Sequence, residues 1–139
     1  MAEAGVELSL DLTQHSVVGY LAVFRNLSQL RRLLLRLVRL ACERQPDVII
    51  CVDYSGFNSR LAHAIRKRIR NKQDWFHDWQ PRIVQYVSPQ VWGWRGGRVH
   101  RIAADYDLVL SIFPFERDWY ARRAPGLRSA TRRRNATSR

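Results

Sequence analysis

The sequence predicts an α/β domain in which helices cover both faces of a parallel sheet. Short apolar runs alternate with longer amphipathic segments along the chain. A strand followed by a helix and a further parallel strand requires a right-handed crossover, and repetition of this unit builds a parallel sheet. The run VIICV at residues 48–52 is apolar throughout, which is typical of a strand buried in such a sheet. With 139 residues, the chain is long enough for one domain with an apolar core.

The other elements follow from the same periodicities. Pro46 ends one helical segment, and Asn58 is of the residue type that caps the start of another. In chain order we expect a strand over 6–12, a helix over 26–44, a strand over 48–52, a helix over 58–70, a strand over 82–87, a helix over 98–104, a strand over 107–113 and a short helix from Pro114 to Tyr120.

The positive charge is concentrated at the carboxyl end. The net charge is +12, but residues 121–139 contain seven arginines and no acid, so residues 1–120 carry 17 bases and 12 acids, a net +5. We therefore expect two regions: a folded domain over 1–120 and a basic, disordered tail over 121–139. Because most of the excess lies in that tail and no nucleic-acid-binding motif is recognisable in the domain, we expect no nucleic-acid partner.

Several kinds of site are not indicated. Cys42 and Cys51 lie in apolar contexts and are expected to be buried, free thiols rather than a disulfide. His77 with Asp74 and Asp78 falls short of a metal-ligand set, so no metal site is predicted. We find no signal-peptide pattern and no apolar run long enough to span a membrane.

The helix expected over 26–44 has an unusually wide apolar arc facing an arginine-rich side. One interpretation is a helix packed on two sides, with its arginines in water. The other is a helix lying in a membrane interface, with its arginines near anionic headgroups. The membrane-contacting residues would then be Leu27, Leu30, Arg32, Leu34 and Arg36.

The candidate site lies where strands end. Asp53 directly follows the strand over 48–52, and the loops 88–95 and 114–116 follow two later strands. The carboxyl ends of parallel strands share one edge of a sheet, so these segments should gather in one cleft. Asp53 is either a general base or a structural, helix-capping aspartate. The two tryptophans of the loop 88–95 cover the core, line a pocket or meet a membrane.

Two stretches resemble a known family. PDVIICVDYSGFNSRLA and IVQYVSPQVWGWRGGRVHRIAADYDLVLSIFPFERDWY resemble lipid-A-disaccharide synthases, glycosyltransferases of the GT-B type with two Rossmann-like domains, and the resemblance covers residues 5–120. It implies a partial, Rossmann-like, acceptor-side N-terminal domain. It also implies transfer of 2,3-diacylglucosamine from its UDP derivative to 2,3-diacylglucosamine 1-phosphate, at the cytoplasmic face of the inner membrane and its anionic surface.

The resemblance also implies roles for particular residues. Asp53 would be the general base that activates the acceptor's 6-hydroxyl for a single, inverting displacement, with no cofactor. The acceptor-side contacts would be Asn58, Ser88, Trp92, Trp94 and Arg95.

The chain also departs from the family pattern. Family members begin with a glycine-rich strand and turn and continue into a donor-binding domain, and the sequence shows neither. Many members have a second aspartate where this chain has Gly56. We therefore expect this chain alone to be inactive in transfer, and a non-catalytic membrane or acyl-glucosamine-phosphate binding module is the alternative function.

Overall fold

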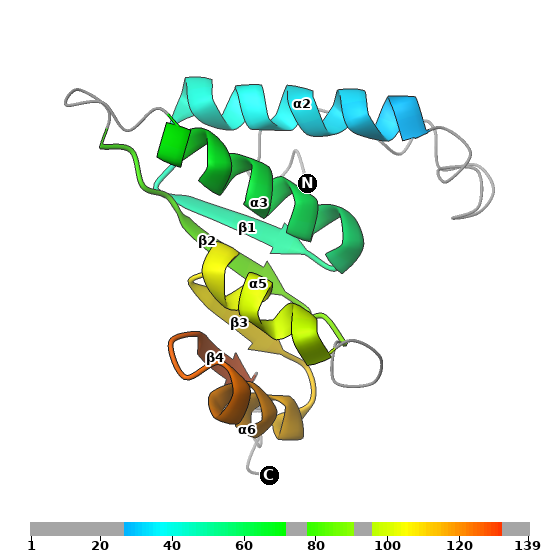
Figure 1. The fold of residues 1–139 in the computed structure, drawn as a ribbon, viewed down its shortest axis with the longest axis vertical. Coiled ribbons are helices and arrows are strands. Elements are labelled where there is room, and N and C mark those ends of the chain that lie inside the picture. Colours follow the sequence, from blue (N-terminus) through cyan, green and yellow to red (C-terminus); the bar gives the residue numbers. More distant parts are fainter. Residues whose placement is uncertain (1–26, 72–77, 91–95, 132–139) are drawn as a thin grey trace, which may run out of the picture. The chain divides into compact units, whose positions relative to one another are not determined.

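The computed structural model describes residues 27–71, 78–90 and 96–131 (Figure 1). The chain forms two compact units, residues 1–35 and 36–139. The elements are α2 (Leu27–Arg44), β1 (Val48–Val52), α3 (Ser55–Asn71), β2 (Arg82–Tyr86), the short 3₁₀ helix η3 (Gly96–Arg98), α5 (Val99–Asp105), β3 (Leu108–Ser111), α6 (Pro114–Arg123) and β4 (Arg128–Thr131). The strand expected over 6–12 lies outside the described residues.

In the described part of residues 36–139, four parallel strands form one sheet in the order β1-β2-β3-β4. Val52 pairs with Tyr86 near the carboxyl ends of β1 and β2, and Leu110 pairs with Tyr86 from the other side. The predicted parallel α/β sheet is thus confirmed. Each strand is joined to the next by a segment that includes a helix, so all carboxyl ends open at the same edge.

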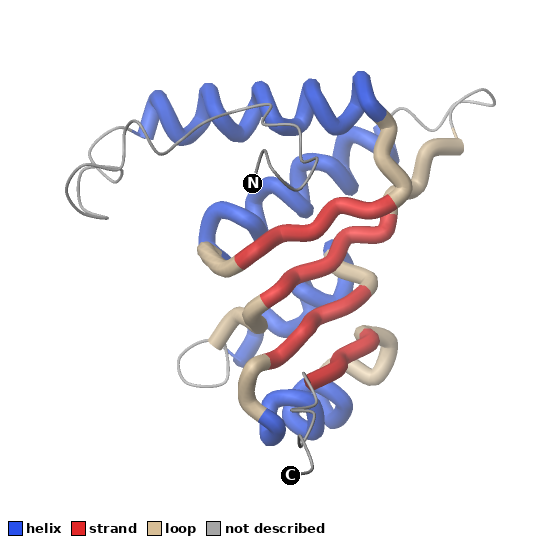
Figure 2. The backbone as a smooth tube through the Cα atoms, turned by 180° about the vertical axis from the view of Figure 1, so that it is seen from behind, coloured by secondary structure: helices blue, strands red, loops and turns tan. Residues whose placement is uncertain are grey.

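Helices α3, α5 and α6 cover one face of this sheet, in front of the strands in Figure 1 and behind them in Figure 2. Helices were expected on both faces of the sheet. Within the described part of residues 36–139, they cover one face only. The strand order explains why. Strands added in one direction through right-handed crossovers place every connecting helix on the same side, and a helix on the other side requires the order to reverse.

The core lies between the sheet and these three helices. On the strands, Cys51, Ile83 and Val109 are buried, and Ile65 of α3 and Tyr120 of α6 are buried opposite them. The alternate residues of β1 point the other way and leave Val48, Ile50 and Val52 exposed on the open face of the sheet. Both cysteines are free thiols: Cys51 is buried, as expected, whereas Cys42 is only half-buried.

Regular structure continues past the boundary expected at residue 120. Helix α6 ends at Arg123, and Arg128–Thr131 form β4, in parallel register with β3. Buried Leu127 contributes to the core just before this strand. The expected disordered tail therefore does not begin at residue 121, because apolar Leu127 and the free edge of β3 allow one more strand to be added.

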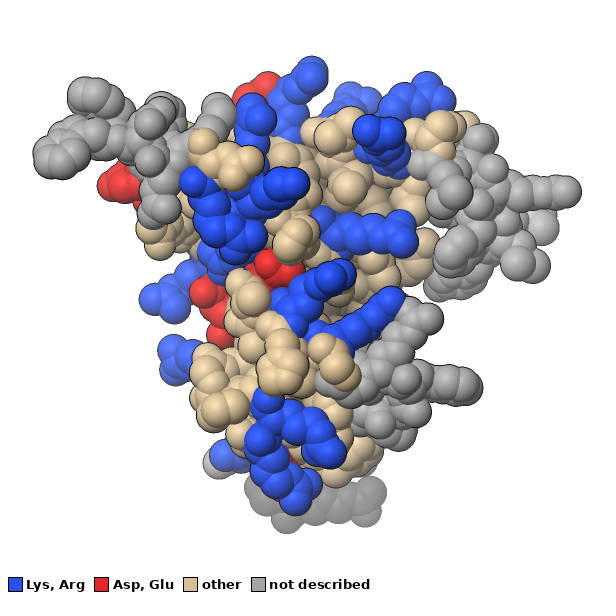
Figure 3. Space-filling model, viewed as in Figure 1, with Lys and Arg blue, Asp and Glu red and all other residues tan. Residues whose placement is uncertain are grey.

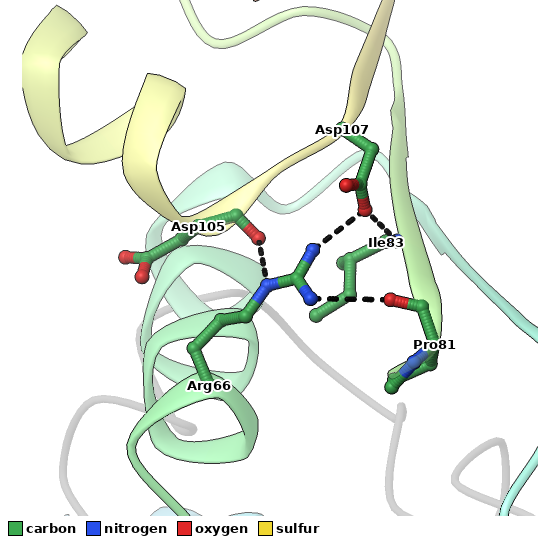
Figure 4. A network of polar contacts seen from close by, with 5 residues as sticks. All are labelled: Arg66, Pro81, Ile83, Asp105 and Asp107. Atoms are coloured by element: carbon green, nitrogen blue, oxygen red, sulfur yellow. Dashed lines mark hydrogen bonds and ion pairs between the residues drawn. The ribbon is translucent and has the colours of Figure 1, made fainter. Parts of the chain in front are cut away.

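A polar network ties α3 to the amino ends of β2 and β3 (Figure 4). The guanidinium of Arg66 donates to the Asp105 and Pro81 carbonyls and to the Asp107 carboxylate, at 3.3, 3.2 and 2.6 Å. The same Asp107 oxygen accepts the backbone N–H of Ile83 at 2.6 Å. The network fixes the amino edge of the sheet. Other residues hold the carboxyl edge, where Asp53 lies.

Candidate active site at the carboxyl edge of the sheet

Asp53 sits at the carboxyl end of β1, as predicted. Its backbone N–H donates to the Tyr86 carbonyl at 2.9 Å, which continues the β1–β2 pairing by one residue. Its backbone then turns into the left-handed region, with φ of 52°, and Tyr54 follows with φ of 27°. Aspartate tolerates this conformation better than most residues. The turn leaves the Asp53 side chain exposed at the edge of the sheet.

Two buried side-chain amides hold this turn through the Asp53 carbonyl. Asn58 donates to it at 2.6 Å and to the Val52 carbonyl at 3.2 Å, and Gln85 donates to it at 2.9 Å. Asn58 comes from α3 and Gln85 from β2, so the turn is fixed from two directions. The backbone of Asp53 is therefore constrained while its carboxylate stays accessible.

Gln85 also holds the end of its own strand. It is fully buried, and its amide donates to the Tyr86 and Val87 carbonyls, both at 3.1 Å. Val87 has φ of 69°, a conformation that is strained for a β-branched residue. Left-handed backbone therefore occurs at the ends of two neighbouring strands, and one glutamine contacts both. Strain of this kind is often found at functional sites.

The loops after β2 and β3 are joined by buried polar contacts. The Ser88 hydroxyl donates to the Glu116 carboxylate at 2.6 Å, and the same carboxylate oxygen accepts the backbone N–H of Phe113 at 3.4 Å. The Tyr120 hydroxyl donates to the Pro89 carbonyl at 2.8 Å. These contacts attach the segment that begins the tryptophan-containing loop to the first turns of α6.

Burial raises the pKa of the Tyr120 phenol above its usual range, and the nearby Glu116 carboxylate raises it further. The phenol therefore keeps its proton at neutral pH. A protonated hydroxyl is what the hydrogen bond to the Pro89 carbonyl requires, so this link persists across the physiological pH range.

Exposed aromatic rings flank the carboxyl edge. Tyr54 follows β1, and Phe113 and Phe115 follow β3, and all three are exposed. The two phenylalanine rings stack with their centroids 5.8 Å apart. Tyr54 stacks on the buried ring of Phe57 at 6.1 Å. The edge thus combines an accessible carboxylate with apolar surface.

The structure describes two of the predicted substrate-binding residues, Asn58 and Ser88. Asn58 is not a helix cap, because α3 begins three residues earlier at Ser55. The Asn58 amide instead donates to the Asp53 carbonyl at the end of β1. Ser88 is buried and bound to Glu116. Both therefore hold the edge in shape. The remaining predicted contacts, Trp92, Trp94 and Arg95, lie outside the described residues.

The residues predicted to contact a membrane all lie on α2. Arg32 and Arg36 are exposed, and Leu30 and Leu34 are half-buried. The side chain of Leu27 lies outside the described set. Among the described residues, no helix has the length and apolarity needed to cross a bilayer.

Sequence reasoning missed Gln85 and Glu116. Gln85 is the polar member of the strand RIVQY at a position of the same parity as buried Ile83, so period-two alternation places it inward. Glu116 lies in the first turn of α6, three residues after Phe113. The sequence therefore contains both the alternation that includes Gln85 and the helix start that includes Glu116. The alternation alone does not show which side of β2 faces the helices.

Among the described residues, this edge holds no metal cluster, and a cavity lies at the other edge of the sheet. Within 27–71, 78–90 and 96–131, no three His, Cys, Asp or Glu side chains gather as a metal site would require. A cavity of about 510 Å³ opens instead near the amino ends of β1 and β2. Its lining residues are Gln45, Asp47, Val48, Asp78, Trp79, Gln80 and Arg82. It lies at the opposite edge of the sheet from Asp53.

Comparison with known proteins gives a consistent result. The profile of the family described as lipid-A-disaccharide synthetase matches residues 1–128. Lipid-A-disaccharide synthase 1 of Legionella pneumophila (strain Lens) is 36% identical over 117 residues, which are 84% of this chain and 28% of that protein. The lipid-A-disaccharide synthase of Myxococcus xanthus is 38% identical over 120 residues, 86% of this chain and 28% of the relative.

The corresponding enzyme of Geobacter sulfurreducens is 34% identical over 122 residues, 88% of this chain and 29% of its own length. The chain thus spans less than a third of the length of these relatives. The profile nevertheless covers both the strand that leads into Asp53 and the loops that follow β2 and β3. The chain therefore belongs to the lipid-A-disaccharide synthetase family.

Proposed function

We propose that these residues form the acceptor-side part of a lipid-A-disaccharide synthase. This enzyme would transfer 2,3-diacylglucosamine from its UDP derivative to 2,3-diacylglucosamine 1-phosphate. The observation that carries the proposal is the accessible Asp53 carboxylate on a turn that two buried amides hold at the carboxyl edge. Ligands of open α/β sheets bind at the carboxyl edge. The relatives that share this segment are named lipid-A-disaccharide synthases.

Asp53 is proposed as the general base. Its carboxylate accepts the proton of the acceptor's 6-hydroxyl while the hydroxyl oxygen forms a bond to the anomeric carbon of the donor. The bond from that carbon to the UDP oxygen breaks at the same time, and UDP leaves with the electron pair. A single displacement inverts the anomeric configuration. The step needs an accessible carboxylate with a fixed backbone, which is how Asp53 is held.

The buried residues of the edge are proposed to position the base and the acceptor loop. Asn58 and Gln85 fix the Asp53 carbonyl, and Ser88 with Glu116 fixes the start of the loop after β2. Positioning of reacting groups contributes much of enzymatic rate enhancement, and small displacements are costly. Asn58 and Ser88 would then act on the substrate through the backbone they hold rather than by touching it.

The remaining acceptor contacts are proposed from the sequence. Trp92 and Trp94 would pack against the acylated sugar, and Arg95 would pair with its phosphate through charge-assisted hydrogen bonds. Their loop leaves the edge at Ser88 and Pro89, both buried, and returns to the described structure at η3. This route starts from the same edge as Asp53.

We further propose a peripheral location on the inner face of the inner membrane. Leucines on α2, including Leu30 and Leu34, would enter the interface, and Arg32 and Arg36 would face anionic headgroups. The exposure of both arginines supports this arrangement. A helix in this orientation lies in the interface without crossing it.

The proposal is tested in a chimera. The matched segment of the Legionella enzyme is replaced by residues 1–128 of this chain, and UDP release is measured with the two proposed substrates. Asp53→Asn is expected to lower turnover by about 10²-fold or more, because a general base contributes that much. Asp118→Asn removes an exposed carboxylate from α6 and serves as the matched control, with turnover unchanged.

Near-normal turnover of the Asp53→Asn chimera would end the assignment. A second measurement uses the chain itself. Binding of 2,3-diacylglucosamine 1-phosphate is followed by amide NMR, and shifts are expected at Asp53, Tyr54 and Phe113. If shifts appear only at the opposite edge, around Asp47 and Arg82, the acceptor site is misplaced.

A second candidate function is binding of the acceptor without transfer. The exposed, stacked rings of Phe113 and Phe115 give the edge beside Asp53 an apolar surface that would suit an acylated sugar. Acceptor binding with no UDP release, in the presence of both substrates, would support this function.

A further inference from the structure

The cavity near the amino ends of β1 and β2 takes no part in the proposed reaction. Its volume of about 510 Å³ falls within the range of about 300–1,000 Å³ that is usual for small-molecule sites. Its lining side chains come from two segments, residues 45–48 at the start of β1 and residues 78–82 at the start of β2. We call it the amino-edge cavity.

The two segments that line the amino-edge cavity are bonded to each other. The Trp79 indole N–H donates to the Pro46 carbonyl at 3.0 Å. The backbone N–H of Arg82 donates to the Asp47 carbonyl at 2.8 Å, which extends the β1–β2 pairing towards the cavity. The walls are therefore held together without a ligand, and a site that is already formed loses less entropy when a ligand binds.

Trp79 gives the amino-edge cavity an apolar surface. The side chain is half-buried, and its only polar atom is engaged by the Pro46 carbonyl. The ring can therefore offer only its carbon surface to a ligand. Val48, which is 49% exposed, adds further apolar area to the lining. A ligand with an apolar face can pack against this part of the wall.

Polar side chains of three kinds line the rest of the amino-edge cavity. They are the carboxylates of Asp47 and Asp78, the amides of Gln45 and Gln80, and the guanidinium of Arg82. Carboxylates accept hydrogen bonds, the guanidinium donates them, and the amides do both. Each hydroxyl group of a ligand can also donate and accept, so a ligand with several hydroxyls matches this mixed set.

The charge of the amino-edge cavity differs from that of the helix-covered side. On α3, α5 and α6, Asp118 is the only exposed acid, and Figure 3 shows Lys and Arg side chains spread over that side. An anionic ligand is attracted there rather than to a cavity with two carboxylates and one guanidinium. A cationic ligand would meet Arg82 in a chain of net charge +12. This balance favours a neutral ligand.

We propose that the amino-edge cavity binds one ring of a neutral saccharide. A pyranose combines an apolar C–H face with hydroxyls around its rim. Its C–H face would stack on Trp79, and its hydroxyls would donate to Asp47 and Asp78 and accept from the amides and the guanidinium. The site lies at the edge opposite to Asp53, and the proposal does not depend on the transfer reaction.

The experiment is an amide NMR titration of the purified chain with methyl β-glucoside. We expect shifts at Val48, Arg82 and the Trp79 indole N–H that saturate at millimolar concentrations. Spermidine and inorganic phosphate, one cationic and one anionic, are titrated in parallel and should leave these three signals in place. Asp53→Asn should not alter glucoside binding, so failure of this proposal is distinguishable from failure of the proposed function.

Two sets of variants test the contacts. Asp78→Ala should weaken glucoside binding on the order of tenfold, because a hydrogen bond to a charged group is lost. Asp118→Ala, the matched control, removes an exposed carboxylate from α6 and should bind like the parent chain. Trp79→Leu should weaken binding roughly five- to tenfold, whereas Trp79→Phe keeps an aromatic face and should retain most of it. Unchanged amide signals of β3 show that each variant is folded.

The proposal is overturned if the glucoside shifts no signal at the amino-edge cavity, or if its shifts are confined to Asp53 and Phe113. Equal binding by Asp78→Ala and Asp118→Ala would also overturn it, as would equal losses in the two Trp79 variants. Larger shifts with spermidine or with phosphate would assign the cavity to a charged ligand instead of a saccharide.

Discussion

Arg66 and Asp107 form an ion pair of 2.6 Å that joins α3 to the amino end of β3. Both side chains are partly shielded from solvent, and Asp107 also accepts the Ile83 N–H. One carboxylate thereby fixes a helix and a neighbouring strand at the edge opposite to Asp53.

Arg66→Met is expected to destabilise the fold by about 1–3 kcal/mol, because Asp107 and two carbonyls lose a charged donor. Arg70→Met, an exposed position on the same helix, should change stability by less than about 0.5 kcal/mol. Urea unfolding measures both. A double-mutant cycle with Asp107→Asn should show coupling, and strict additivity would contradict a direct interaction.

Gln85→Leu is expected to release the turn at Asp53. The substitution leaves the Asp53, Tyr86 and Val87 carbonyls without their shared donor, at a cost on the order of 3 kcal/mol. Hydrogen exchange at the amides of Asp53 and Phe57 should accelerate more than at Ile83. Gln90→Leu, at an exposed loop position, is the control. Unchanged exchange at Asp53 would show that Asn58 alone holds the turn.

The two faces of the sheet should respond differently to the same substitution. Ile83 is fully buried beneath the helices, and Ile83→Thr should cost about 2–4 kcal/mol. Ile50 is 63% exposed, and Ile50→Thr should change the unfolding free energy by less than about 0.5 kcal/mol. A large loss from Ile50→Thr would show that the open face is covered in solution.

Stability should fall in alkaline solution. Burial raises the pKa of the Cys51 thiol from 9.0 to about 11, so between these values the unfolded chain has released a proton that the native state keeps. Stability is then fully present below pH 9 and decreases up to pH 11, by on the order of 2 kcal/mol. The pKa of Tyr106 and of Tyr120 is raised chiefly by burial, which adds a further loss above pH 10.

Urea unfolding under reducing conditions at a series of pH values tests this expectation. Cys51→Ala should remove the decrease that begins near pH 9, and Cys42→Ala, the matched control, should retain it. A decrease of equal size in both variants would assign the effect to other groups.

Local patterns predicted much of this fold because they report directly on single elements. The apolar run 48–52 ends where β1 ends, and Asp53 lies at the edge where it was expected. Asn58 was misplaced as a cap because capping rules consider only the helix, whereas its amide serves the preceding strand. The first turn of α3 instead begins with Ser55 and Gly56, ahead of Asn58.

Other features depend on information that a local pattern lacks. The inward position of Gln85 follows from alternation only once it is known which side of β2 meets the helices. The single covered face follows from strand order, which no one segment specifies. The roles of Trp92, Trp94 and Arg95 remain predictions, since these residues lie outside the described structure.

The order of the strands also bears on how the chain folds as it is synthesised. In the described sheet, every strand pairs with the strand that immediately precedes or follows it in the sequence. Contacts between consecutive segments close short loops and favour fast folding. β2, β3 and β4 therefore each pair with a strand that has already been synthesised, so the sheet can grow from β1 towards β4 during translation.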